Sequence, residues 1–352
     1  MLLWFGIYPV FPMYGMTMWK DVFFGLIICL IVLNICMLCL ADESQQKKLL
    51  LHNVVLSLLM CLIRHNGVIV FVPSAIALAI RFRKHRKFYI LSASGVLAFY
   101  LLLQFVIIPL SSVLTWRNSE GFSIPLQQIA RVVFYDPDSL SDDQKQVIAD
   151  YFNGRDLAAL YNPVLSNNVK FSLDEDAFAK NPQPLIKLWW DLGRTHLKAY
   201  IEAPLQNSYG YWWPGAVKLQ NAALGLGYEN YCGIHSQPLI RSKIMEKIGD
   251  FMLNDRYYTV PVLSWLFTPG LFGWILFFLW RWSRYRSNSM RIALVPLLSL
   301  WIQMLGCPAF CELRYVYGLP AALPLMMCCM LLPLPEKTSV NGGSFALQDL
   351  LD

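Results

Sequence analysis

The chain has 352 residues, of which 56% are hydrophobic and only 15% are charged. A soluble domain carries about 25% charged residues and lacks several separate apolar runs of near-membrane length. The composition therefore predicts an all-α, multi-pass membrane protein. The net charge of +6 is concentrated in two short loops, 81–87 and 281–291, instead of forming a nucleic-acid-binding face. We expect the lipid bilayer as a partner and no nucleic acid.

Four predicted spans precede a long polar segment: residues 22–40, 49–63, 67–80 and 88–110. The first has 19 residues and is about 28 Å long, enough to cross the hydrocarbon core. Residues 49–80 would measure about 48 Å as one helix, so we predict two short helices that turn at Asn66-Gly67. Residues 41–48 are polar and predict a break in the chain of helices.

Residues 111–260 predict a separate, mostly helical domain outside the bilayer. Between 111 and 258 there are 14 Lys and Arg against 16 Asp and Glu, so the domain is nearly neutral. Ser141 to Gln144 has a capping-box pattern and predicts a helix start, and the apolar spacing over 184–201 roughly fits one helix face. The membrane region 261–334 follows, with predicted spans 261–280, 292–310 and 314–334, and then a polar tail, 335–352. The total is about seven spans.

The basic loops set the expected orientation. With a turn at Asn66-Gly67, the loops 81–87 and 281–291 fall on one side, which the positive-inside rule assigns to the cytoplasm. The 111–260 domain then lies outside the cell membrane, and the tail lies inside. The segment 1–18 is apolar, broken by prolines and without the basic start of a signal peptide. We expect it to be an interfacial segment or, by preference, the start of a chain that lacks its natural N-terminal part.

Three polar clusters at the outer ends of spans form the candidate site. The strongest is Arg64-His65-Asn66-Gly67, because an Arg at the end of a short membrane helix is costly unless it meets an anion. Its planar fork can hold a phosphate through two hydrogen bonds. The other clusters are Lys20-Asp21, before the first span, and Glu312-Leu313-Arg314-Tyr315, before the last. The competing interpretation is that the cations only reach the interface and the tyrosines only line it.

These clusters predict phosphate-binding residues and one weak catalytic candidate. The predicted phosphate-binding residues are Lys20, Arg64, His65, Asn66, Glu312, Arg314 and Tyr315. We expect Asp21 to cap a helix, and it is the weak local candidate for a general base. Further candidates to line a cleft are Gln127, Gln128, Arg131, Tyr211 and Trp212, of which the aromatic pair could instead lie on the membrane surface. No metal cluster is visible in the sequence, no cofactor is predicted, and a divalent-metal requirement stays open.

Together these motifs resemble those of GT-C-type membrane glycosyltransferases, which transfer a sugar from a polyprenyl-phosphate donor on the outer face. More closely, the chain resembles a group of Gram-positive multi-pass proteins of unknown function and of that general type. The likeness covers most of the chain and rests on Lys20-Asp21, Arg64-His65-Asn66-Gly67, residues 124–131 and residues 210–214. GT-C enzymes usually carry an acidic residue in the loop after their first span. No residue here corresponds to it, so the resemblance assigns no general base.

The resemblance implies a glycosyltransferase that moves a sugar from a polyprenyl-phosphate donor to a cell-surface glycan or protein. Two alternatives stay open: a non-catalytic, degenerate or accessory membrane protein that binds a lipid-linked phosphate, and a polysaccharide polymerase or ligase. A transporter is disfavoured, because the sequence has no inverted repeat and few polar groups inside its spans.

Overall fold

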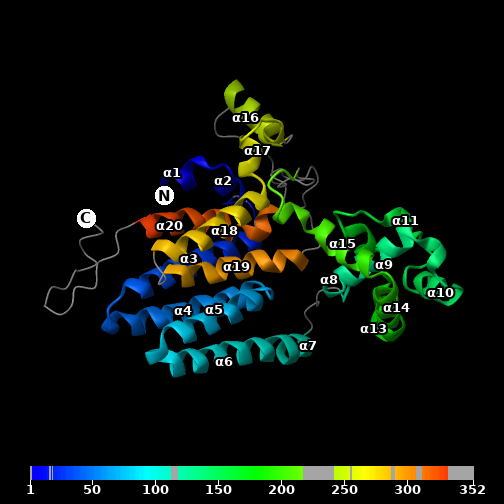
Figure 1. The fold of residues 1–352 in the computed structure, drawn as a ribbon, viewed down its shortest axis with the longest axis horizontal. Coiled ribbons are helices and arrows are strands. Elements are labelled where there is room, and N and C mark those ends of the chain that lie inside the picture. Colours follow the sequence, from blue (N-terminus) through cyan, green and yellow to red (C-terminus); the bar gives the residue numbers. More distant parts are fainter. Residues whose placement is uncertain are drawn as a thin grey trace.

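The computed structural model describes residues 2–15, 17, 19–111, 118–216, 242–253, 256–286, 290–306 and 311–331. Every helix or strand element assigned in these ranges is a helix, so the predicted all-α class is confirmed. Figure 1 shows a bundle of long helices and a smaller group of helices, α8 to α15, beyond one end of it. We call the end of the bundle that carries residues 19–21, 63–67 and 311–315 the domain end. The opposite end, with residues 81–86 and 281–286, is the basic end.

The N-terminal half of the bundle is built on a central helix. α3 (Lys20–Leu40) packs against α4 (Glu43–Ile63) on one side and α20 (Gly318–Leu331) on the other. α5 (Gly67–Arg81) lies beside α4, and the last stretch runs from η1 (Arg83–His85) through α6 (Arg86–Leu102) and η2 (Leu103–Ile107) to α7 (Ile108–Leu110). That last stretch is the outermost, and only 6% of its most apolar 18-residue window is buried.

The turn between α4 and α5 lies where the sequence predicts it. Arg64 caps α4 and Gly67 begins α5. A Cβ atom at Gly67 would lie 2.6 Å from the carbonyl oxygen of Met60, so the close approach of the two helices requires glycine. The predicted break over 41–48 is present but shorter, because it covers only Ala41 and Asp42 and α4 already begins at Glu43. The Glu, Gln and Lys residues there are good helix formers and extend the helix beyond its apolar part.

The C-terminal half of the bundle contains three helical stretches. They are α17 (Leu263–Leu266) with α18 (Pro269–Arg286), then η6 (Met290–Leu294), α19 (Val295–Ile302) and η7 (Gln303–Gly306), and finally η8 (Leu313–Val316) with α20. The span predicted over 261–280 is therefore displaced: its long helix begins at Pro269 and continues to Arg286. α16 (Lys243–Leu253) and η5 (Arg256–Thr259) precede these stretches.

Two short N-terminal helices pack against this half of the bundle. α1 (Leu2–Ile7) and α2 (Val10–Gly15) bring aromatic rings onto it. Phe11 and Tyr14 pack edge-on against Tyr317, with ring centroids 5.5 and 5.7 Å away, and the Tyr8 hydroxyl donates to the Leu266 carbonyl. The apolar character of this segment is thus used in packing against α20 and α17.

Four helical stretches are long and apolar enough to cross a membrane: Lys20–Leu40, Glu43–Ile63, Arg83–Leu110 and Leu313–Leu331. Gly67–Arg81 and Met290–Gly306 are apolar but shorter. Positions 307–310 and 332–334 of the last two predicted spans, and the tail 335–352, lie outside the described residues. The architecture is compatible with a membrane-embedded protein, and the number of seven spans stays a prediction.

The domain beyond the bundle has its own hydrophobic core around α9 (Ser123–Tyr135), with Leu126, Ile129 and Phe152 fully buried. Its other helices are α8 (Asn118–Gly121), η3 (Pro137–Ser139), α10 (Asp142–Tyr151), α11 (Leu157–Leu160), α12 (Asn167–Phe171), α13 (Glu175–Lys180), α14 (Gln183–Thr195) and α15 (Leu197–Asn207). The predicted capping box is present at Ser141, whose hydroxyl accepts from the Gln144 amide while the Gln144 side chain accepts from Ser141.

The prediction of one apolar helix face over 184–201 is wrong. The helix breaks at His196, and Leu197 and Ile201 on the following helix are exposed. The Tyr200 hydroxyl donates to the Trp189 carbonyl at 2.5 Å. Its ring lies so near Gly193 that a Cβ there would come within 2.8 Å of Cε1. The chain therefore turns back on itself at this point, and α15 buries Tyr200 and Ala203.

Candidate functional site at the domain end of the bundle

Three segments far apart in the sequence meet at the domain end of the bundle. They are the start of α3 with Lys20 and Asp21, the turn that follows α4 with Arg64, and the residues around η8 with Glu312, Arg314 and Tyr315. We call these residues, with Trp19 and Phe24, the charged cluster. The antiparallel course of α3 and α4 returns the chain to this end at Arg64, and α20 begins there beside α3.

The first contact is an ion pair between α3 and the α4–α5 turn. Arg64 Nη1 lies 2.5 Å from Asp21 Oδ1, and the two side chains are only 12% and 9% exposed. The Arg64 guanidinium carbon also lies 5.6 Å from the ring centroid of Phe24 and 4.8 Å from that of Tyr315. An ion pair and two aromatic faces thus hold this arginine, in a place where an unpaired charge would be costly.

The second ion pair lies within the η8 segment. Arg314 Nε lies 3.0 Å from Glu312 Oε2, and Arg314 Nη2 donates to the Tyr315 hydroxyl at 3.1 Å. The guanidinium carbon is 4.5 Å from the ring centroid of Trp19 and 4.8 Å from that of Tyr315. Tyr315 therefore contacts both arginines and joins the two ion pairs. The Arg314 side chain is 23% exposed and that of Arg64 is 12% exposed, so Arg314 is the more accessible of the two arginines.

Lys20 and His65 complete the polar surroundings. Lys20 is exposed and has no ion-pair partner in the part of the chain that the structure describes. Burial, with the charges of Lys20 and Arg64 adding to it, lowers the pKa of His65 below its ordinary value of 6.5. His65 is therefore neutral at pH 7, while its backbone carbonyl accepts from the Tyr100 hydroxyl at 3.5 Å. Asn66 leads into α5 as its N-cap residue, without a side-chain cap hydrogen bond.

The charges in this cluster nearly cancel. Three cations, Lys20, Arg64 and Arg314, stand against the carboxylates of Asp21 and Glu312, which leaves one net positive charge. Because each carboxylate is bonded to an arginine, an incoming anion meets Lys20 and the exposed edge of Arg314 first. The arrangement can accept one phosphate-like group without opening both ion pairs.

An aromatic loop joins the domain to the charged cluster. Tyr211, in η4 (Tyr209–Tyr211), is 1% exposed, and its hydroxyl accepts from the Glu312 amide at 3.2 Å and donates to the Glu312 carbonyl at 3.4 Å. Its own carbonyl accepts from Trp301 Nε1 at 2.7 Å, and the carbonyl of the partly exposed Trp212 accepts from Trp274 Nε1 at 2.8 Å. Tyr211 therefore lies beside the site as a structural joint between domain and bundle, and it is too buried to form an open stacking surface.

Gln128 and Arg131 lie away from this cluster, inside the domain. The Gln128 amide donates to the Tyr200 carbonyl at 2.8 Å and accepts from Trp189 Nε1 at 2.7 Å. Arg131 donates to the Tyr161 hydroxyl and to Gln206, forms an ion pair with Glu202 and lies over the Tyr135 ring. The prediction that these residues line a cleft is corrected, because partners within their own domain occupy both side chains. Gln127 likewise donates to the Asn162 carbonyl.

The comparison with known protein families identifies a relationship over nearly the whole chain. A model of the family of unknown function DUF6020 matches residues 1–341. The chain belongs to this family. No curated protein and no solved structure matches it.

Two residues of the site in this DUF6020 protein are not predicted from the sequence. Trp19 and Phe24 each lie against a guanidinium, and nothing in their local sequence separates them from ordinary interfacial or core aromatics. The usable signal is their position one residue before Lys20 and three residues after Asp21, on the same helix end. As for metals, no group of three or more His, Cys, Asp or Glu side chains is arranged to hold an ion within the described ranges.

Proposed function

We propose that this protein is a membrane glycosyltransferase that moves a sugar from a polyprenyl-phosphate donor to a cell-surface acceptor. The observation that carries the proposal is the charged cluster itself. Two arginines and a lysine from three separate segments meet at one end of an apolar bundle, directly beside a separate polar domain. A lipid-linked donor has the matching form, since its apolar chain can lie against the bundle while its phosphate reaches the cations.

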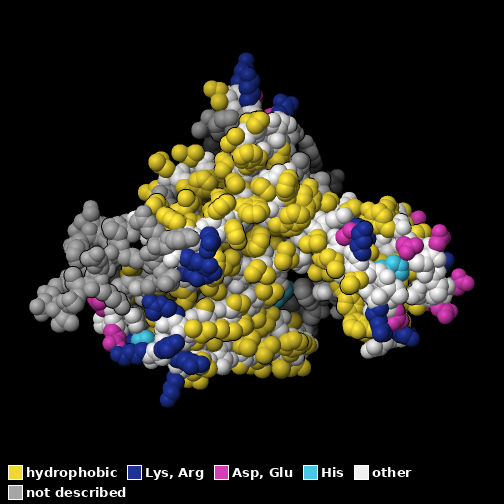
Figure 2. All heavy atoms as spheres, in the orientation of Figure 1, with side chains coloured by type: hydrophobic (Ala, Val, Ile, Leu, Met, Phe, Trp, Pro, Cys, Tyr) yellow, Lys and Arg dark blue, Asp and Glu magenta, His cyan; other side chains and the backbone are white. Residues whose placement is uncertain are grey.

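The orientation follows from the opposite end of the bundle. In Figure 2 the Lys and Arg side chains visible on the bundle gather at the end opposite the domain. The positive-inside rule places such a basic end in the cytoplasm. The domain and the charged cluster then face the outer side of the cell membrane, where the acceptor would be a glycan or a protein.

Four residues of the charged cluster would take part in the transfer. As the acceptor oxygen bonds to the sugar's anomeric carbon, the bond to the phosphate oxygen breaks, and the lipid phosphate leaves with the electron pair. Arg314 and Lys20 would stabilise that developing negative charge. The positive charge of Arg64, which is paired with Asp21, would add to this stabilisation. The acceptor proton would go to Asp21, whose Oδ1 lies against Arg64 and whose second oxygen would take the proton.

A second function is favoured by a different observation. Asp21 and Glu312 are each already bonded to an arginine, which suits recognition of an anionic lipid better than proton transfer. A non-catalytic protein that binds a lipid-linked phosphate would need the cations of the cluster and no base at all. The two functions therefore differ in turnover and agree in binding.

The test measures binding and turnover separately on the full-length protein in nanodiscs. Binding is titrated with polyprenyl phosphate, and sugar transfer is followed with a polyprenyl-phosphate sugar donor and a crude cell-surface acceptor fraction. Arg314→Gln is the informative variant. Arg155→Gln, an exposed arginine in the domain, is the matched control for loss of one positive charge on the same side.

Three outcomes are distinguishable. If the transferase proposal is right, the wild type turns over and Arg314→Gln loses about 10²- to 10³-fold in rate, as when an oxyanion donor is removed, while Arg155→Gln stays within twofold. Binding by the wild type without turnover, weakened in Arg314→Gln, supports the non-catalytic function. Equal binding by the wild type, Arg314→Gln and Arg155→Gln overturns both.

A further inference from the structure

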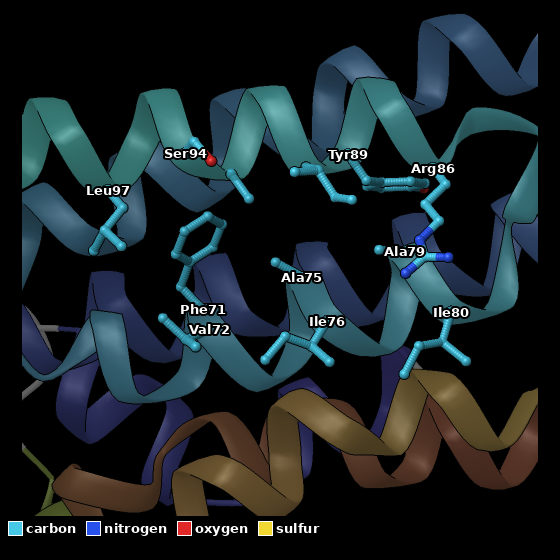
Figure 3. Close-up of a pocket in the computed structure, with 12 residues that line it drawn as sticks. Phe71, Val72, Ala75, Ile76, Ala79, Ile80, Arg86, Tyr89, Ser94 and Leu97 are labelled. Atoms are coloured by element: carbon cyan, nitrogen blue, oxygen red, sulfur yellow. The ribbon is translucent and has the colours of Figure 1, made fainter.

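An apolar groove runs between α5 and α6, on the opposite side of α5 from the core of the bundle. It has a volume of about 380 Å³, and all but three of its lining residues are apolar. Figure 3 shows the two helices facing each other across it, with Phe71 and Leu97 near one end and Arg86 with Ile80 at the other. Its width comes from small side chains, Ala75 and Ala79 on α5 and Ala93 and Ser94 on α6, where larger residues would have closed the space.

One end of the groove carries two polar side chains, Arg86 and Tyr89, whose polar groups have no partner among the described residues. Arg86 is exposed and reaches from α6 toward Ala79 on α5 (Figure 3), and it has no ion-pair partner among the described residues. Tyr89, one turn further along α6, is 3% exposed, and its hydroxyl oxygen is buried without a hydrogen-bond partner in the structure. A buried hydroxyl without a hydrogen-bond partner is unfavourable, so its place in the lining of the groove favours a ligand with hydrogen-bonding atoms.

The dimensions match one leaflet of a bilayer. From Arg86 to Leu97, α6 rises about 16 Å at ~1.5 Å per residue, and half of the hydrocarbon core is about 15 Å thick. The charged end of the groove lies at the basic end of the bundle, where headgroups would lie, and its apolar end would reach the bilayer centre. A groove of this length accommodates one extended acyl chain.

We propose that this groove binds one acyl chain of an anionic phospholipid, whose phosphate is held by Arg86 and the Tyr89 hydroxyl. The phosphate supplies acceptor oxygens to both groups, and its negative charge complements Arg86 and the other basic residues of the 81–87 loop. The site lies at the opposite end of the bundle from the charged cluster and does not depend on the function proposed there.

A transmembrane helix of a partner or of a second copy is the less suitable occupant. A helix with its side chains is about 10–12 Å wide, whereas this groove is the gap between two helices that already pack against each other. A helix would cover its rim and leave the floor of alanines empty. It would also bring no anion to Arg86 unless it placed an acidic residue at that depth.

The test uses the full-length protein in phosphatidylcholine nanodiscs that contain a small fraction of a photoreactive lipid. The photoreactive lipid is phosphatidylglycerol with a diazirine in one acyl chain, and the same chain on phosphatidylcholine serves for comparison. After irradiation, mass spectrometry maps the labelled peptides. The variants are Arg86→Gln, Tyr89→Phe and Ala75→Trp, with Arg83→Gln as the control because Arg83 is exposed in the same loop and does not line the groove.

The expected result is labelling of the facing sides of α5 and α6, about fivefold stronger for phosphatidylglycerol, the ratio that one basic contact at a membrane surface supports. Arg86→Gln should abolish this preference, Tyr89→Phe should reduce it, and Arg83→Gln should keep it. Ala75→Trp should lower labelling by both lipids; if that variant does not fold, Ala93→Leu fills the groove with less volume. Equal labelling by the two lipids, or labels spread evenly around α6, would overturn the proposal.

Discussion

The ion pair between Asp21 and Arg64 gives the sharpest test of what holds the charged cluster together. Arg64→Gln would leave the Asp21 carboxylate, 9% exposed, without its partner. Removing one member of a buried ion pair costs about 3–5 kcal/mol. Because both side chains keep some contact with solvent, we expect the lower end of that range, about 3 kcal/mol. For a chain of this size that corresponds to a fall of about 6 °C in the unfolding temperature.

A double-mutant cycle separates the charge interaction from the aromatic contacts. Arg64→Gln also removes the packing on Phe24 and Tyr315, whereas Asp21→Asn leaves the arginine in place. The double variant buries no unpaired charge, so it should be more stable than the sum of the two single changes predicts, by about 1–2 kcal/mol. Lys84→Gln, which breaks an exposed pair with Glu43, should shift the unfolding temperature by less than about 1 °C.

Thermal unfolding in detergent can be followed with a thiol-reactive dye. Cys36 and Cys61 are 2% and 1% exposed, so they react only when the bundle opens, whereas the exposed Cys328 gives the starting signal. All variants are compared at one heating rate, because membrane proteins of this kind unfold irreversibly. The reasoning is refuted if Arg64→Gln shifts the transition no more than Lys84→Gln does, or if the double variant is as unstable as the two single effects added.

Three further predictions concern the site and its domain. The lowered pKa of His65 means that the unfolded chain binds a proton more readily than the folded one. Stability should therefore be complete above about pH 6.5 and decline below it, and His65→Gln should reduce the difference in unfolding temperature between pH 7.5 and pH 5.5; an unchanged difference contradicts this. Ser141→Ala should cost about 1 kcal/mol by removing the capping box, seen as faster hydrogen exchange in α10, while Ser139→Ala leaves the exchange of α10 unchanged. Gly210→Ala should disturb the joint with the bundle, because the new Cβ would lie 2.6 Å from the Cys311 Cβ; protease nicking between domain and bundle should increase, and a wild-type pattern would show that the joint tolerates the methyl group.

The convergence of the charged cluster was predictable from sequence because it follows from topology. Helices that alternate direction return their ends to the same side, so placing the turn at Asn66-Gly67 is enough to bring Arg64 near Lys20 and Glu312. What the arginines bond to was not predictable. The sequence predicts Asp21 as a helix cap, and this is wrong: the N-cap position of α3 is Trp19, and Asp21 lies inside the helix and pairs with Arg64. Whether an arginine bonds to a carboxylate, a lipid phosphate or solvent depends on distances between side chains, which the periodicity of the sequence does not give.

In the domain, too, the sequence predicts local contacts and does not predict contacts between distant residues. The capping box at Ser141 depends on neighbours in sequence and was predicted correctly. Gln128 and Arg131 were placed in a cleft because they are polar and follow a span, yet Trp189, Tyr200 and Glu202, far along the chain, enclose them. Likewise, the break at His196 depends on how Tyr200 folds back onto α14, and apolar spacing alone cannot detect such a contact.

The joint at Tyr211 has a mechanical consequence. Its hydroxyl holds both backbone groups of Glu312, and the side chain of the same residue neutralises Arg314. A rigid displacement of η4 must therefore either break two hydrogen bonds or carry Glu312 with it, away from the guanidinium. The domain and the charge state of the cluster are thus linked through one residue. A ligand that moves the domain would change the affinity of the cluster for an anion, and by reciprocity an anion bound at the cluster would bias the position of the domain.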